Sequence, residues 1–164
     1  MSTTNAHCNI TSIKKYVPEA SIIFEIGAHD GRDIDLINSL WDEPIIHCFE
    51  PDPEPYEILI SYENKNIICN NVGLNYKTGT SLLYKVYDKN ITDQTTRSDF
   101  FKTAQSLYPI NTNYHRYGNG DQIELQSIEI PVITLNDYCN TNNVIPNILL
   151  IDTQGSEYDI LRGA

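Results

Sequence analysis

The sequence lacks the features that would place it in several large classes of protein. No apolar run approaches the ~20 residues that a membrane-spanning helix needs. The opening MSTTNAHCNI has neither the basic nor the apolar segment of a secretory signal peptide. Lys and Arg number 11 against 22 Asp and Glu, so the net charge is −11 at pH 7, and no basic cluster occurs. Because such a charge repels phosphate groups, we expect no membrane span and no nucleic-acid partner.

Cysteine is scarce and irregularly spaced. The four cysteines, Cys8, Cys48, Cys69 and Cys139, form no C-x-x-C pair and have no histidine pattern nearby, so we expect no metal site. Cys48 and Cys69 fall inside apolar segments typical of buried strands. Buried thiols without a disulfide pattern indicate a reducing, cytoplasmic setting.

What the chain does contain is an alternation of two periodicities over 164 residues, a length that suits one domain. Short apolar runs typical of buried parallel strands alternate with segments of helical spacing. The expected strands are residues 21–26, 45–49, 67–72 and 148–151, and the expected helices follow Gly31 and begin near Pro53, Thr134 and Ser156. This order predicts an α/β domain with a parallel sheet and helices on both of its faces.

The middle of the chain departs from this order. Residues 81–87 and 122–133 look like strands, and the polar stretch 88–122 between them has no sustained period. Insertions of this length are uncommon unless they carry function or are disordered. Two readings of the His115-Arg116-Tyr117 stretch stay open, a solvated loop or part of a lid over an acceptor.

The candidate site lies where the predicted parallel strands end, because ligands of open α/β sheets bind outside the carboxyl ends of the strands. The stretch FEIGAHDG (24–31) follows the first strand and Glu50 the second, while residues 70–72 close the third and Asp152 ends the fourth. Glycines at both ends of the first turn would let the backbone approach a ligand closely.

The spacing of these groups suits an adenosine ligand. Glu50 follows Gly31 by 19 residues, where a carboxylate accepts hydrogen bonds from both hydroxyls of a ribose. His29 stands where the nicotinamide fingerprint requires its middle glycine. Glu25 inside the first strand suits a cationic ligand, and S-adenosylmethionine combines an adenosine with an ammonium and a sulfonium group.

Five stretches in order, FEIGAHDG, HCFEPDPEPYEIL, NVGL, IPVITLNDY and LLIDTQGSEYDILRGA, resemble the FkbM-type class I methyltransferases from about residue 22 to the end. The resemblance implies a seven-stranded Rossmann-like domain with S-adenosylmethionine as methyl donor and S-adenosylhomocysteine as product. It also implies O-methylation of a hydroxyl on a sugar or another small-molecule or glycan acceptor.

The resemblance also implies roles for individual residues. Asp152 would lie beside the reacting end and is the first candidate for a catalytic base, followed by Glu157 and His29. The resemblance places Glu25, Gly27, His29 and Gly31 around the methionine part, Glu50 at the ribose and Asn71 near the adenine. The expected cofactor-binding residues also include Ala28, Asp30, Pro51, Val72 and Asp152.

Four positions depart from the family pattern. His29 replaces an Asn, Asp30 an apolar residue and Asn136 an Asp, and Gln154 replaces the first Glu of Asp-x-Glu-Gly-x-Glu. Gln154 keeps a second hypothesis open, a non-catalytic module that binds an adenosine ligand or a protein partner.

The end of the sequence also bears on the expected fold. The family's sheet continues after the last helix with three more strands, so we expect residues 1–164 to form a single, C-terminally incomplete domain. The strand 148–151 would then expose an edge that permits self-association, and Ile160 and Leu161 in the last helix would lack packing partners.

Overall fold

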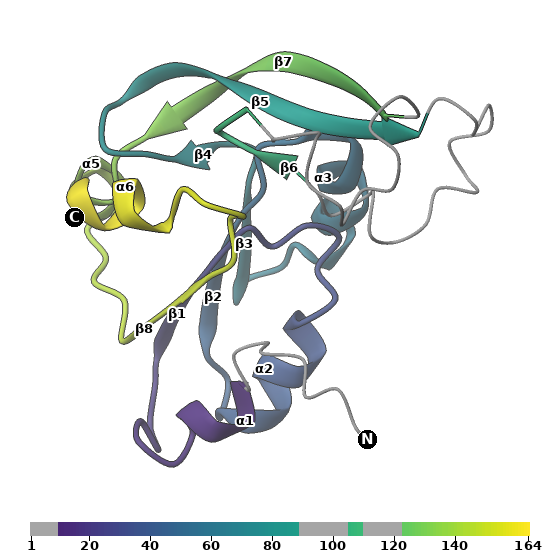
Figure 1. Cartoon of the computed structure of the whole chain (residues 1–164). Coiled ribbons are helices and arrows are strands. Elements are labelled where there is room, and N and C mark those ends of the chain that lie inside the picture. Colours follow the sequence, from purple (N-terminus) through teal and green to yellow (C-terminus); the bar gives the residue numbers. More distant parts are fainter. Residues whose placement is uncertain (1–9, 89–104, 110–122) are drawn as a thin grey trace.

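The computed structural model describes residues 10–88, 105–109 and 123–164. Its centre is a parallel sheet of four strands, which confirms the four apolar strands expected from the sequence. The order is β3-β2-β1-β8, and every neighbouring pair is parallel (Figure 1). The strands are β1 (Ile22–Ile26), β2 (Ile45–Phe49), β3 (Ile67–Asn70) and β8 (Ile148–Ile151).

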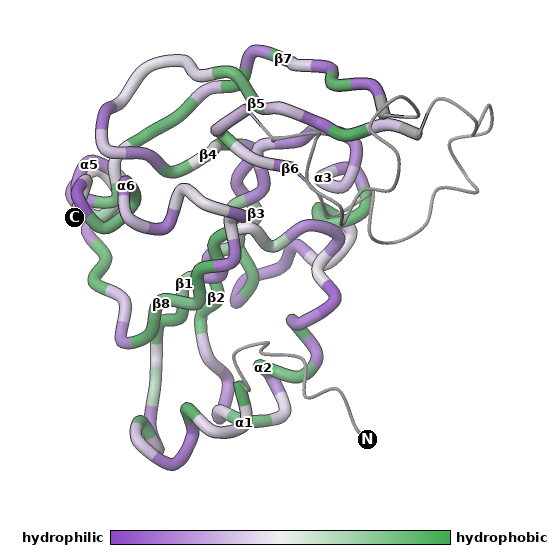
Figure 2. The backbone as a smooth tube through the Cα atoms, viewed as in Figure 1, coloured by the Kyte–Doolittle hydropathy of each residue, from purple (hydrophilic) through white to green (hydrophobic). Residues whose placement is uncertain are grey.

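Helices cover both faces of this sheet, as the alternating pattern predicts. One hydrophobic cluster joins β1 and β2 to the helices α1, α2 and α3, and a second joins the same strands to α5 and α6. Figure 2 shows the hydrophobic residues gathered along β1, β2 and β8. The helices are α1 (Ile10–Ile13), α2 (Ile34–Leu40), α3 (Pro53–Leu59), the short 3₁₀ helix η1 (Ile60–Tyr62), α5 (Leu135–Asn142) and α6 (Glu157–Arg162).

Side-chain caps explain where two of the helices begin. The Asp52 carboxylate accepts a hydrogen bond from the Glu54 amide at 3.1 Å, and Pro53 occupies the first helical position of α3. Thr134 accepts from the Asp137 amide at 2.9 Å at the start of α5. Both starts agree with the sequence-based expectation.

A second sheet lies beyond the carboxyl ends of the parallel strands, at the top of Figure 1. Its order is β4-β7-β5-β6, and β5 pairs with β7 in antiparallel register from Gly79↔Val132 to Asp88↔Ile123. The expected strands 81–87 and 122–133 are therefore present. The four strands are β4 (Gly73–Leu74), β5 (Gly79–Asp88), β6 (Gln105–Ser106) and β7 (Ile123–Ile133).

The polar insert 88–122 is described only in part. Within it, β6 pairs antiparallel with β5, with Lys85 opposite Gln105 and Tyr84 opposite Ser106. The stretch 115–117, for which a lid was one reading, lies outside the described residues.

Among the described strands, β8 pairs only with β1 and forms one edge of the parallel sheet. Ile148 is buried, and the following three residues are partly exposed. The Leu161 side chain is 54% exposed, but the expectation that Ile160 lacks packing partners is wrong. The Ile160 side chain is fully buried and belongs to the second cluster, together with Phe49 and Leu135. α5 therefore provides the packing surface that the sequence pattern alone does not reveal.

Candidate functional site

A cavity of about 1200 Å³ lies between the carboxyl ends of the parallel strands and the second sheet. This volume is ample for a nucleoside-sized ligand, since small-molecule sites span roughly 300–1,000 Å³. Three residues expected at the site, Asp30, Gly31 and Asn71, are not part of its wall. Those that line it are Glu25, Gly27, Ala28, His29, Glu50, Pro51, Val72, Asp152 and Glu157.

Gly27 owes its identity to the protein's own packing. Its φ is 87°, and a Cβ atom added there would lie 2.1 Å from the carbonyl oxygen of Asp152. The amide of Gly27 also donates to the carbonyl of Phe49 at 2.9 Å. The glycine thus lets the first turn pack against the turn that follows β8, which brings two of the predicted strand ends together.

Gly31, at the other end of the turn, is confined in the same way. Its φ is 83°, and an added Cβ would lie 3.0 Å from side-chain atoms of Ile34 and Tyr62. At both glycines the nearest atoms belong to the protein, so close approach of a ligand is not needed to explain them.

Glu25 places a buried carboxyl group in the wall of the cavity. Its side chain is 6% exposed and accepts a weak hydrogen bond from the Cys48 thiol at 3.5 Å. Burial raises the pKa of Glu25 to about 8. A cationic group in the cavity would favour ionisation of this carboxyl group, because an opposite charge nearby stabilises the charged form.

Glu50 is fixed by backbone amides on both of its carboxylate oxygens. Oε2 accepts from the amide of His29 at 2.9 Å and Oε1 from the amide of Asp52 at 2.8 Å. Burial raises the pKa of Glu50 to about 7, even though both amide bonds lower it. A carboxylate has about four acceptor positions, so the group can still accept bonds from hydroxyls in the cavity that it lines.

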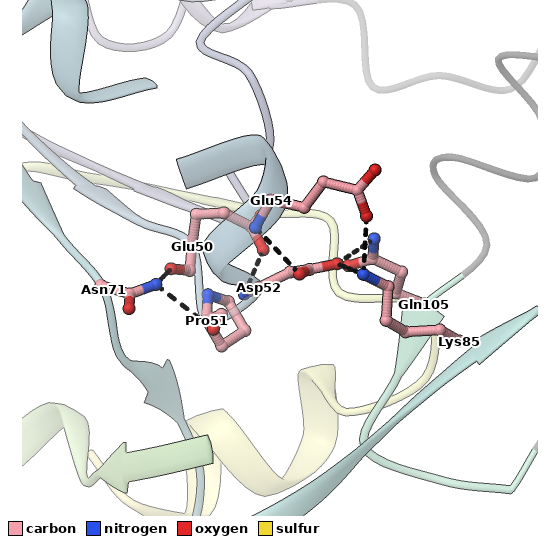
Figure 3. Close-up of polar contacts among 7 residues, drawn as sticks. All are labelled: Glu50, Pro51, Asp52, Glu54, Asn71, Lys85 and Gln105. Carbon is pink, nitrogen blue, oxygen red and sulfur yellow. Dashed lines mark hydrogen bonds and ion pairs between the residues drawn. The ribbon is translucent and has the colours of Figure 1, made fainter. Parts of the chain in front are cut away.

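Asp30 and Asn71 both make contacts within the protein. The Asp30 carboxylate accepts from Arg32 at 2.9 and 3.0 Å, and the Arg32 guanidinium holds the pKa of Asp30 down at about 2. The Asn71 side chain donates to the carbonyl of Glu50 at 2.8 Å and to that of Pro51 at 3.3 Å (Figure 3). Asn71 thus steadies the loop that carries Glu50, and direct cofactor contacts of Asp30 and Asn71 stay predictions.

The two catalytic candidates, Asp152 and Glu157, lie at the turn after β8 and differ in their exposure and hydrogen bonds. Asp152 is exposed in the cavity wall, and its Oδ1 accepts from the Gln154 side chain at 2.9 Å. Glu157 uses its Oε1 to accept from the amides of Thr153 and Gly155 at 3.2 and 3.0 Å. Burial raises the pKa of Glu157, but these and further hydrogen bonds outweigh burial, so the pKa is lowered. Glu157 therefore closes the turn and is a weaker base, whereas Asp152 is open to the cavity.

The second sheet completes the cavity with residues that the sequence reasoning missed. Leu83, Gln105 and Leu107 line its wall. Gln105 donates to a carboxylate oxygen of Asp52 at 2.6 Å, and the neighbouring Ser106 hydroxyl donates to the carbonyl of Gln154 at 2.9 Å. β6 thus connects the loop after β2 with the turn after β8. The only signal for this in the sequence is the length of the polar insert.

A family model for the methyltransferase FkbM domain matches residues 25–164. The chain belongs to the FkbM methyltransferase family. The match spans all four strand ends that meet at the cavity, so the resemblance read from the five ordered motifs is confirmed. No curated protein and no solved structure shows significant similarity to this FkbM domain.

Two further features of the FkbM domain concern only its described parts. Within residues 10–88, 105–109 and 123–164, no three His, Cys, Asp or Glu side chains are grouped so that they could hold a metal ion. None of the helices in these ranges is long and apolar enough to cross a membrane.

Proposed function

We propose that this FkbM domain binds S-adenosylmethionine in the cavity and transfers its methyl group to a hydroxyl oxygen. The observation that carries the proposal is the Glu50 carboxylate, which two backbone amides fix at the cavity wall at the end of β2. A fixed carboxylate at this position is suited to the two hydroxyls of a ribose.

The residues present fit the other parts of such a ligand. Glu25 offers a buried carboxyl group that gains from a neighbouring cation, such as the ammonium of the methionine part. Val72 and Pro51 line the cavity beside the loop after β2, where an adenine would have apolar contacts. When bound, S-adenosylmethionine supplies an electrophilic methyl group on its sulfonium sulfur.

The chain's own part in the reaction is to align the acceptor, exclude water and receive a proton. Alignment of the acceptor oxygen supplies much of the rate in a displacement of this kind. Asp152, exposed in the cavity wall, takes up the proton that the acceptor hydroxyl loses as its oxygen gains the methyl group. We propose a sugar or another small-molecule or glycan hydroxyl as the acceptor.

The proposal is tested by calorimetric titration of S-adenosylhomocysteine into the wild-type protein and Glu50→Gln. The variant should bind at least about ten-fold more weakly, because hydrogen bonds to a charged acceptor contribute about 1.5–3 kcal/mol each. Glu57→Gln is the matched control, since this Glu lies exposed on the neighbouring α3 and should bind like the wild type. Equal affinities of Glu50→Gln and the wild type would refute the ribose assignment.

One observation favours the alternative of a non-catalytic module. The Gln154 side chain, at a position where the family motif has Glu, donates to Asp152 Oδ1 at 2.9 Å and occupies part of the proposed base. A protein that binds S-adenosylhomocysteine tightly but transfers no methyl group to any hydroxyl acceptor would support this alternative.

We also propose a cytoplasmic location. The free thiols of Cys48, Cys69 and Cys139 are compatible with a reducing compartment.

We further propose self-association through β8. This partly exposed apolar strand lies at the edge of the parallel sheet and offers backbone groups for pairing. Sedimentation across a range of concentrations tests the association, and a monomer at all of them would refute it.

A further inference from the structure

Lys85 is a buried lysine outside the motifs that identify the family domain. It lies on β5 of the second sheet and is 4% exposed. Its Nζ lies 2.6 Å from Asp52 Oδ2 and 2.9 Å from Glu54 Oε2 (Figure 3). Leu83, two residues earlier and thus on the same face of β5, lines the cavity. Lys85 therefore crosses from the second sheet to the loop that begins α3.

Asp52, the partner of Lys85, is linked directly to Glu50. The Asp52 side chain is fully buried, and its Oδ2 also accepts from Gln105 at 2.6 Å. Its backbone amide donates to Glu50 Oε1 at 2.8 Å. The backbone of Asp52 is thus fixed by its own side chain, and the same backbone orients the Glu50 carboxylate. Figure 3 shows this chain of contacts running from Lys85 to Glu50.

A buried ion pair adds little net stability compared with apolar residues of the same size, because both charges lose their hydration. An apolar residue at position 85 would also pack beside Leu83, which belongs to the small core of the second sheet. Lys85 nevertheless carries a charge here, and Asp52 connects it to Glu50 at the cavity. This connection points to a role for Lys85 at Glu50.

We propose that Lys85 is a positioning residue for cofactor binding, which holds Asp52 and thereby orients the Glu50 carboxylate toward the cavity. The proposal rests on the proposed ribose-binding role of Glu50. It assigns a function to the second sheet, because a residue of β5 then acts on a group at the end of β2.

Electrostatics give Lys85 an effect that a purely structural residue would lack. Burial and the Asp52 charge raise the pKa of Glu50, whereas the amides of Asp52 and His29 and the charge of Lys85 lower it. The ionised carboxylate has about four acceptor positions, whereas the protonated group gives up part of this capacity to its own proton. Ligand affinity should therefore fall as the pH drops through about 7, and loss of the Lys85 charge should move this Glu50 midpoint to higher pH. Glu25, which lines the same cavity, adds a separate dependence with a midpoint near 8, which the Lys85 variants share with the wild type.

The test is the affinity for S-adenosylhomocysteine, measured by calorimetry between about pH 6 and pH 9, in Lys85→Met, Lys85→Arg and the control Lys77→Met. Lys77 is an exposed residue shortly before β5. Lys85→Met should weaken binding about ten-fold near pH 7 and raise the midpoint by about half a pH unit or more. Lys85→Arg keeps the positive charge and should retain the wild-type affinity and midpoint. Lys77→Met should match the wild type in both.

Lys85→Met leaves Asp52 buried without its cation, so this variant can fail to fold. Lys85→Gln then carries the test, because it keeps a hydrogen-bond donor for Asp52 without the charge and should show the same rise in midpoint. A midpoint equal to that of the wild type in the folded Met or Gln variant would overturn the proposal.

The Glu50→Gln titration separates the two proposals. If Glu50→Gln binds like the wild type, the ribose assignment fails and the role of Lys85 fails with it. If Glu50→Gln binds weakly and loses the midpoint near pH 7, while the Lys85 variants keep the wild-type midpoint, the role of Lys85 alone is refuted.

Discussion

The parallel sheet and the second sheet border the same cavity but contribute to it in different ways. The parallel strands offer their carboxyl ends, with Glu25 inside β1 and with Glu50 and Asp152 directly after β2 and β8. The second sheet offers the face of β5 and the short strand β6, with Leu83 and Gln105 in the wall.

The two sheets also differ in what holds them. Two large hydrophobic clusters enclose the parallel sheet, whereas the second sheet has a small buried core of Leu83, Ile130 and Val132. Polar pairs such as Lys85 with Asp52 and Ser106 with Gln154 attach it to the rest of the domain. We infer that the parallel sheet sets the stability of the domain and that the second sheet adjusts the site.

The largest expected effect is that of Gly27→Ala on stability. The new Cβ would lie 2.1 Å from the carbonyl oxygen of Asp152 at a φ of 87°, so β1 and β8 would have to move apart. We expect a loss of about 3 kcal/mol or more in the free energy of unfolding, from overpacking and backbone strain together. Urea denaturation measures the loss.

Gly79→Ala is the matched change in the second sheet. Gly79 also has a positive φ, 153°, but an added Cβ would have no atom within 4 Å. We expect a loss of only about 1 kcal/mol from backbone strain. Equal losses at the two glycines would contradict the assignment of stability to the parallel sheet.

The second expected effect is on turnover. It compares a change in the turn after β8 with a change in the second sheet that contacts this turn. Asp152→Asn should lower the rate of S-adenosylhomocysteine formation about a hundred-fold, because no carboxylate then takes up the proton of the substrate hydroxyl. Cofactor affinity should change far less. Ser106→Ala removes the contact of the second sheet with the same turn and should lower the rate less. Parallel losses of rate and affinity in Asp152→Asn would show that Asp152 serves the cofactor instead.

The smallest expected effect is a pH-dependent change in the stability of the ligand-free protein. The pKa of Glu25 rises from 4.5 to about 8 on folding, so the folded state favours the protonated form. Its contribution to stability is fully present below about pH 4.5 and is lost as the pH rises through about 8. Glu25→Gln should therefore raise the melting temperature at pH 8 by about 3 °C and change it little at pH 5.

Glu129→Gln, an exposed position on β7, is the control from the second sheet and should leave the melting curve unchanged at both pH values. The pKa of the Glu50 carboxyl group is also raised, so the melting temperature of both variants still depends partly on pH. A melting temperature of Glu25→Gln below that of the wild type at pH 8 would contradict burial as the cause of the shift.

Much of the parallel sheet could be predicted because its signals are local. Apolar runs of four to six residues, a glycine turn and the caps Asp52 and Thr134 each depend on neighbours within a few positions. The same logic placed Glu50 and Asp152 at one edge, since parallel strands end on the same side of a sheet. For that reason most of the expected site residues do line the cavity.

The family, the four parallel strands and the acids near their carboxyl ends can thus be inferred from the residues alone. Only the three-dimensional packing shows that Gly27 is required by the carbonyl of Asp152 and that Lys85 lies behind Glu50. The difference arises from distance along the chain. Periodicity and capping arise between neighbouring residues, whereas these contacts join residues that only the packing of the second sheet and β8 onto the first three strands brings together.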